Sequence, residues 1–475
     1  MSQRIADEKP GLDFSEYAIA LHFVAETDAV GVERKDPSRS DINFKSFEDD
    51  ILSYAYRATP PFTSEVVDVG ESLRDLVLCF PPSISYEAEG ERVTLHVAGS
   101  LADDRERTIA IRASRTDFSS GVSVLHVVFV PGQPSCTLNE YDIVKLTKLW
   151  EHSEAVGMGE HGEAVSMAEL LTLQTTDSAR RERSVFQLAE EVFRLTGSAR
   201  HTEDDPRAPR LGSIQLANVR EWDAIEASIN SLDATSTQDL SVELIGVGGV
   251  VQGLLDFTQI GVGELTDVFD LVHVDKRGLL GMHKATIVAI EKSARVYRQT
   301  RETLGMSPYL LLPQAVLLHN EWLLHSAEKA AEEAVRAVGA EKGKSLTDKL
   351  AGAEHKMRIA LDVAYVPNVF HYPAERGLYA QGSRSRALRD RRRKLQGQLA
   401  AVSGWWREEI ARRRERADDW RNFLLALIGA IGLAAAVYPV LEDIHVGVWP
   451  RVVASLVLAL LASSVYAWLQ WRPRR

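Results

Sequence analysis

Two long uncharged stretches near the C-terminus constrain this chain more than any other feature. Residues 422–441 read NFLLALIGAIGLAAAVYPVL and residues 452–471 read VVASLVLALLASSVYAWLQW, each 20 residues without Asp, Glu, Lys or Arg. A helix of that length spans about 30 Å, the thickness of the hydrocarbon core of a bilayer. The sequence therefore predicts a hairpin of two transmembrane helices. The alternative, two helices buried in a soluble core, is disfavoured by aromatic residues near the ends of both stretches, namely Trp420, Tyr438, Trp449, Trp468 and Trp471.

Basic residues set the expected orientation of this hairpin. Arginines precede the first stretch and follow the second, whereas the connecting loop over 442–451 offers only Arg451. The positive-inside rule then places both termini in the cytoplasm and the chain in the bacterial inner (cell) membrane. The loop also carries Glu442 and Asp443, which we predict as pore-mouth residues because a ring of carboxylates favours cations.

Small residues recur along the first stretch. Small side chains let helices approach closely, so this helix is expected to pack on copies of itself, the alternative being ordinary lipid-facing sequence. The predicted pore-lining and packing residues are Asn422, Ala426, Gly429, Gly432 and Ala436.

Charge is unevenly distributed along the chain. The net charge is −12, of which residues 384–421 contribute +7 (13 basic, 6 acidic) and residues 422–475 contribute +2 (4 basic, 2 acidic), so residues 1–383 carry −12 − 7 − 2 = −21. An acidic body of this kind argues against nucleic acid as a partner, because phosphate binding needs a basic face. The two cysteines, Cys79 and Cys136, do not form a CxxC pair, which fits a reducing cytosol and makes a zinc site unlikely.

Periodicity divides the chain into a mixed α/β body and a helical C-terminal part. Apolar residues spaced by three, four and seven over 383–421 predict a long coiled-coil-like stalk helix, preceded by a helical pair over 313–338 and 345–363. The predicted strands of the body are 17–24, 75–80, 92–99, 107–114, 122–130, 213–218 and 241–247, and its predicted helices are 140–150, 164–172, 178–196 and 219–231. The predicted domains are the body over 1–305 with a subdivision near 200–212, the helical pair over 306–382, the basic stalk over 383–421, the spans over 422–441 and 452–471 with their loop over 442–451, and the basic tail over 472–475.

Three groups of residues in the body and the helical pair are candidates for chemistry. Gly246-x-Gly248-Gly249 after an expected strand indicates either a tight turn or close backbone packing, or else a phosphate loop with Gly248 and Gly249 as ligand candidates. The carboxylates that follow indicate either a solvated acidic face or a divalent-cation site: Asp256, Glu264, Asp267 and Asp270. His319-Asn320-Glu321 and His325 lack the zinc order HExxH and favour a polar contact between helices. No catalytic arrangement is evident, so we expect no enzyme.

The order of an acidic body, a helical pair, a long stalk and two spans resembles the CorA family of two-span cation transporters and channels. The resemblance covers residues 313–475 best and implies a funnel-shaped homopentamer with the first span lining the pore. The family motif Gly-Met-Asn is absent, since the matching position reads Val437-Tyr438-Pro439-Val440.

Three functions follow as hypotheses. The first is a poorly selective cation channel or transporter gated by its cytoplasmic domain. The second, also implied by the resemblance, is a membrane effector of a bacterial antiviral system, opened by a nucleotide second messenger. The third is a membrane-tethered binding or signalling protein without a pore. No cofactor is assigned; a divalent cation such as Mg²⁺ and a small nucleotide are the candidate ligands, and the chain itself and the bilayer are the expected partners.

Overall fold

The fold was analysed in a computed structural model, which forms two compact units. Unit 1 comprises residues 1–327 and 359–395, and unit 2 comprises residues 328–358 and 396–475. The structure describes residues 12–26, 62–67, 76–79, 83–88, 91–96, 108–131, 138–140, 143, 156–158, 164–166, 172–175, 183–184, 210–217, 222–230, 242–252, 263, 265, 272–275, 278–283, 286–292, 308–341, 344–370, 373–443, 447–450, 452–454, 457, 461 and 464.

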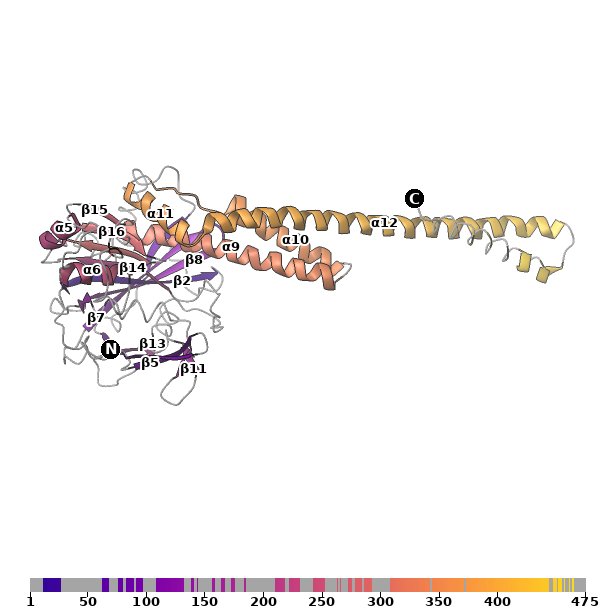
Figure 1. Ribbon diagram of the computed structural model, residues 1–475. Helices are drawn as coiled ribbons and strands as arrows, with labels where there is room; N and C mark the ends of the chain where they lie inside the picture. Colours follow the sequence, from indigo (N-terminus) through magenta and orange to yellow (C-terminus); the bar gives the residue numbers. More distant parts are fainter. Residues whose placement is uncertain are drawn as a thin grey trace. The chain divides into compact units, whose positions relative to one another are not determined.

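A large mixed sheet forms the centre of unit 1 (Figure 1). Its strands, in spatial order, are β13 (Arg183–Ser184), β12 (Thr172–Thr175), β4 (Leu76–Cys79), β7 (Thr108–Phe118), β8 (Val122–Pro131), β2 (Glu16–Glu26), β14 (Arg210–Ala217), β17 (Thr286–Glu291), β16 (Gly278–His283) and β15 (Val272–Asp275), with β3 (Phe62–Val67) also paired to β7. Strands β14 and β17 pair in parallel, whereas the other pairs are antiparallel.

Short two-stranded sheets accompany the large one. They pair β1 (Asp13–Phe14) with β9 (Leu138–Asn139), β5 (Ser83–Ala88) with β6 (Glu91–His96), and β10 (Val156–Met158) with β11 (Ala164–Ser166).

The central strands of the large sheet are buried on both faces. In β2 and β8 the apolar residues on both faces of the strand are buried, for example Tyr17, Ala18, Val127 and Val128. Such near-continuous apolar runs need helices or loops on each face of a sheet. The covering helices of unit 1 are α5 (Trp222–Asn230), α6 (Val242–Gln252), the first part of α9 (Pro308–Ala340), the π-helix η5 (Ile359–Val363) and α11 (Pro373–Ser385), which lies beside β16.

Unit 2 is a set of three helical segments. The end of α9, helix α10 (Lys344–Arg358) and α12 (Leu388–Asp443) from residue 396 onward lie side by side (Figure 1). One face of α10 is buried through Leu346, Leu350, Ala353 and Met357. Val402 of α12 is buried as well, and the Ser403 hydroxyl donates to Glu354 Oε1 at 3.0 Å. Beyond Arg413, α12 continues with mostly exposed side chains.

Most strand predictions are confirmed, with small shifts of the ends. The expected strands at 17–24, 75–80, 92–99, 107–114, 122–130 and 213–218 correspond to β2, β4, β6, β7, β8 and β14. The strand predicted at 241–247 is wrong, because this segment belongs to helix α6. Its apolar residues have no clear period, and a short apolar run does not separate a buried helix from a strand. The helix predicted at 164–172 is also wrong at both ends, where β11 and β12 lie, and the helix predicted at 178–196 is wrong at 183–184, which form β13.

The predicted two-span hairpin is wrong. No helix within the described part of the chain is long and apolar enough to cross a membrane. The first uncharged stretch continues helix α12, whose residues up to Arg421 are rich in arginine, glutamate and aspartate. Most of the second stretch lies outside the described residues. The fold that the structure supports is an α/β region with helices, and the finding also contradicts the description of the chain as a membrane protein and ion channel.

Candidate functional site

A group of buried polar side chains lies where α9 meets the central strands of unit 1. We call it the buried polar layer. It consists of Thr116 in β7, His126 in β8, His22 in β2, Ser213 in β14, and Gln314, His319 and Asn320 in α9. Each of these side chains is at most 2% exposed. Polar groups this deeply buried must be hydrogen-bonded, because leaving one unpaired costs about 1–3 kcal/mol.

A chain of hydrogen bonds connects four of these side chains across three neighbouring strand pairs. His22 and His126 are direct partners in the β2–β8 register, and their Nδ1 atoms lie 2.6 Å apart. His126 Nε2 lies 3.2 Å from Thr116 Oγ1, and His22 Nε2 lies 3.5 Å from Ser213 Oγ. Two Nδ1 atoms can bond only if one carries a proton and the other accepts it, so the two imidazoles adopt opposite tautomers.

Burial keeps these histidines neutral. It lowers the pKa of His126 from 6.5 to about 3, and it also lowers the pKa of His22, with further contributions from His126 and the Arg386 guanidinium. A second proton, on the accepting Nδ1, would break the 2.6 Å hydrogen bond and create a buried imidazolium. The neutral pair is therefore the form that this structure holds.

Gly212 makes room for the His22 ring. A β-bulge between Leu211 and Ser213 in β14 brings its backbone against the imidazole. A Cβ at Gly212 would overlap the His22 ring and lie 2.8 Å from Gln314 Nε2. The glycine is thus required by the close approach of α9, β2 and β14, since every other residue would displace the histidine.

Two residues of the buried polar layer, His319 and Asn320, attach α9 to distant parts of unit 1. His319 stacks on Phe118 with ring centroids 3.9 Å apart, and its Nε2 lies 2.8 Å from the Ser120 hydroxyl. Burial lowers the pKa of His319 to about 3, opposed in part by its hydrogen bond with Asn320.

The Asn320 carboxamide pairs with the backbone of Val366 in both directions. Its Nδ2 donates to Val366 O at 2.7 Å, and its Oδ1 accepts from Val366 N at 2.9 Å. Asn320 Nδ2 also donates to the Tyr379 hydroxyl, which itself donates to Val366 O at 2.9 Å. The prediction of a polar contact between helices is confirmed for Asn320, but the partners lie in α11 and the segment before it rather than in α10.

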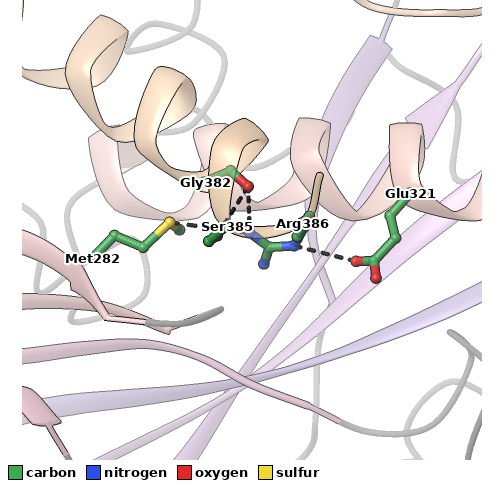
Figure 2. A network of polar contacts seen from close by, with 5 residues as sticks. All are labelled: Met282, Glu321, Gly382, Ser385 and Arg386. Atoms are coloured by element: carbon green, nitrogen blue, oxygen red, sulfur yellow. Dashed lines mark hydrogen bonds and ion pairs between the residues drawn. The ribbon is translucent and has the colours of Figure 1, made fainter. Parts of the chain in front are cut away.

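A buried ion pair joins α9 to the residue that follows α11. Figure 2 shows the Arg386 guanidinium between Met282 of β16 and Glu321 of α9. Arg386 Nε lies 3.2 Å from Glu321 Oε2, with side chains only 4% and 13% exposed. Its Nη1 contacts Met282 Sδ at 4.0 Å and Gly382 O at 3.5 Å. Removing one partner of a buried pair leaves an uncompensated charge, which costs about 3–5 kcal/mol.

The residue after this arginine has a left-handed backbone. Ala387 has φ 50°, the only positive φ of a non-glycine residue among the described residues. It separates α11, which ends at Ser385, from α12, which begins at Leu388. A left-handed conformation costs about 1–2 kcal/mol for a residue with a Cβ.

The glycines that the sequence suggested as ligand residues lie inside a helix. Gly248 and Gly249 are buried within α6 and do not form a loop after a strand. A Cβ at the neighbouring Gly246 would come within 3.1 Å of Leu12, which confirms close packing as the role of that glycine. Asp256, Glu264, Asp267 and Asp270 lie outside the described residues. Within the described residues no group of three or more His, Cys, Asp or Glu could hold a metal ion.

The candidate residues of the first uncharged stretch lie along α12. Asn422 and Ala426 are half-buried, whereas Gly429, Gly432 and Ala436 are exposed, and a Cβ added to either glycine would meet no atom within 4 Å. In a single chain these small residues are therefore not at a close contact. Glu442 and Asp443 are the last two residues of the helix.

A second surface of interest is the part of α12 that carries large exposed apolar side chains. We call it the apolar segment of α12, and its residues are Trp420, Phe423, Leu424, Leu425, Leu427, Ile428 and Ile431. Trp420 and Ile428 are each 63% exposed. With 3.6 residues per turn, all of them except Leu425 fall within an arc of about 140°. An apolar stripe of this width on a helix marks a face that packs against another surface.

Comparisons with protein-family models, with curated proteins and with solved structures find no match to this chain.

Proposed function

We propose that this chain is a homo-oligomeric binding and signalling protein, not an enzyme, and that the apolar segment of α12 is its assembly surface. The observation that carries the proposal is the row of large exposed apolar residues from Trp420 to Ile431. Most of the stability of a protein helix comes from packing of its apolar face. Between Arg414 and Ile431 only Ala430 is buried, so the described part of the chain supplies little of that packing.

A second copy of the same helix is the occupant that the local charges favour. Arginines before and at the start of the apolar segment are paired within the helix, as in Arg412–Glu408 at 2.6 Å, Arg413–Glu409 at 3.8 Å and Arg421–Asp418 at 3.5 Å. Paired charges flanking an apolar stripe are typical of helices that associate with each other. They also reduce the local excess of positive charge that would favour an anionic surface.

The same helix carries small residues outside the apolar stripe, with Gly429 facing away from the stripe and Gly432 beside its edge. Gly429 and Gly432 are exposed and have open space around their Cα atoms. Small residues allow two helices to approach closely, whereas the apolar stripe provides buried area. Each copy thus offers two different surfaces, which permits a closed ring. The fivefold assembly that the sequence resemblance implies stays a prediction.

In this proposal unit 1 is the part that responds to a ligand. The described residues assign no ligand, and the small nucleotide or divalent cation expected from the sequence remains a prediction. The hypotheses of a channel and of a nucleotide-opened membrane effector both require the two-span hairpin, so we propose neither.

Cross-linking tests the assembly surface directly. In a background with Cys79 and Cys136 replaced by serine, Ile428→Cys should form an interchain disulfide under mild oxidation, seen as a dimer on a non-reducing gel. The matched control is Val335→Cys in α9, since Val335 is an exposed apolar residue (47% exposed) outside the segment. Equal cross-linking of both variants, or of neither, would contradict the proposed surface.

A lipid surface is the competing partner for the same segment. Repeating the cross-linking with vesicles of neutral and of anionic lipid distinguishes association between copies from binding to lipid. If the copies associate through the segment, the disulfide forms without vesicles. A disulfide that forms only with vesicles would show that lipid covers the segment instead.

A further inference from the structure

The junction between α11 and α12 combines three features within three consecutive residues. Arg386 is buried and paired with Glu321, Ala387 has a left-handed backbone, and Leu388 at the start of α12 is fully buried. The chain therefore turns within two residues between two helices. Backbone hydrogen bonds continue on both sides of the turn, from Arg386 N to Gly382 O and from Asp390 N to Ala387 O.

We propose that this junction is a two-state latch in which the Arg386–Glu321 ion pair holds α11 and α12 as separate helices. Two residues, Arg386 and Ala387, separate the helices, and of these Ala387 has the left-handed φ of 50°. If Ala387 adopted a right-handed helical conformation, the backbone from Pro373 onward would become one continuous helix. Alanine is the residue that most favours this change, since it has the highest intrinsic helix propensity.

The packing of α11 explains why the latch stays closed. Gly382 lets α11 approach α9 and β16 so closely that a Cβ there would overlap Leu317 and lie 2.7 Å from Met282 Sδ. The same glycine supplies the carbonyl that accepts from Arg386 Nη1. Figure 2 shows these groups surrounding the guanidinium, with Ser385 bonded to the Gly382 carbonyl beside it. The closed state therefore depends on contacts at Arg386, together with the buried Leu388 and the Arg392 Nη2–Leu361 O hydrogen bond of 2.8 Å at the start of α12.

A latch of this kind converts a local event into a change of helix direction. Any event that separates Arg386 from Glu321 removes the ion pair that opposes helix continuation at the junction, which shifts the equilibrium toward a changed direction of α12 relative to α11. Discrete alternative packings of this type are how proteins amplify small shifts at a site. The inference concerns unit 1 alone and does not depend on how many copies assemble.

Spin-label distances between the two helices test the latch. In the cysteine-free background, labels are placed at Arg376→Cys in α11 and Arg393→Cys in α12, both exposed positions. A continuous helix would separate them by about 25 Å along its axis, because each residue rises 1.5 Å. We expect a single shorter distance in the otherwise unchanged protein and an additional population near that length in Glu321→Gln. Adding Ala387→Gly to Glu321→Gln should reduce the long population at least about threefold, because glycine disfavours the helix and accepts the left-handed turn.

The control is Glu332→Gln, which removes a carboxylate of the same helix from an exposed pair with Arg336. It should leave the distance distribution unchanged. Gly382→Ala provides a second, independent opening of the junction and should also produce the long population. Circular dichroism identifies a variant that has lost its fold. If either Glu321→Gln or Gly382→Ala is unfolded, the distances in the other variant test the latch. A folded Glu321→Gln or Gly382→Ala protein that keeps only the short distance would overturn the latch.

Discussion

His22 and His126 meet in the middle of the sheet with their Nδ1 atoms 2.6 Å apart, and the ring that accepts this bond cannot take up a proton on Nδ1 without losing it. The relationship makes the stability of unit 1 sensitive to acid. His126 and His319 have their pKa lowered to about 3, and that of His22 is also lowered. In the unfolded chain each histidine takes up a proton near pH 6.5.

The first prediction follows from the sign of these shifts. The folded-state pKa values of the histidines lie below those of the unfolded chain. The folded state is therefore most stable above pH 6.5, and this contribution to its stability is lost as the pH falls toward 3, because only the unfolded chain takes up protons in this range. We expect the free energy of unfolding to decrease by up to about 1.4 kcal/mol per pH unit for each histidine. Denaturant unfolding between pH 7.5 and 4.5 measures the slope. The slope should decrease in His319→Gln, and an unchanged slope in that variant would contradict the assignment.

The second prediction concerns the close approach at Gly212. Gly212→Ala should destabilise unit 1 by about 2–3 kcal/mol, because the new methyl group overlaps the His22 ring and must displace it. Urea unfolding gives the value. Gly352→Ala in α10 is the control, since a Cβ there meets no atom within 4 Å and should be neutral or slightly stabilising. Similar effects at both positions would argue that the His22 contact is not needed.

The third prediction separates hydrogen-bond donation from size. Asn320→Asp keeps the shape of the side chain but cannot donate to Val366 O, and it buries a charge beside that carbonyl. We expect a loss of about 2–4 kcal/mol in the free energy of unfolding. Asn368→Asp removes a longer, exposed bond to Arg376 O and should cost less than about 1 kcal/mol. A small effect at Asn320 would show that its pairing with Val366 contributes little.

The sequence predicted several strands of the sheet but not the polar contacts between them. Alternating apolar residues and β-branched residues identified β2, β7 and β8. This pattern is visible in the sequence because burial of a sheet face constrains neighbouring positions of a strand. The pairing of His22 with His126 depends on strand register across 104 positions, which no local pattern encodes. Asn320 was recognisable as a helix-contact residue, since a polar His-Asn-Glu run interrupts an apolar helix face.

Arg386 was not singled out from the sequence, and the stretch 422–441 was misread, both for physical reasons. Arg386 stands among the basic residues of 384–421, and composition does not distinguish one buried arginine from its solvated neighbours. The stretch 422–441 meets the length and hydropathy of a membrane span, yet the structure makes it the continuation of a charged helix, and no described helix qualifies as a span. Hydropathy alone does not determine whether another protein surface or lipid covers an apolar helix.

The fourth prediction tests the left-handed backbone at Ala387. Ala387→Gly should stabilise unit 1 by about 1 kcal/mol, because glycine adopts φ 50° without a steric cost. Ala380→Gly, at an exposed position inside α11, should instead destabilise it by about 0.5–1 kcal/mol. Thermal unfolding of the two variants gives the comparison. Destabilisation by both substitutions would show that Ala387 is not strained.

The central claim, assembly through α12, is tested most directly by sedimentation equilibrium of the full chain and of Leu424→Glu with Ile428→Glu. Leu424 and Ile428 are one turn apart on the stripe and are 40% and 63% exposed, so two charges there leave the fold of a single chain intact while opposing association. We predict that the wild-type chain sediments as a multiple of its own mass, with five copies as the expected number, and that the double variant sediments as a monomer. A monomeric wild-type chain, or a double variant of unchanged mass, would contradict the account.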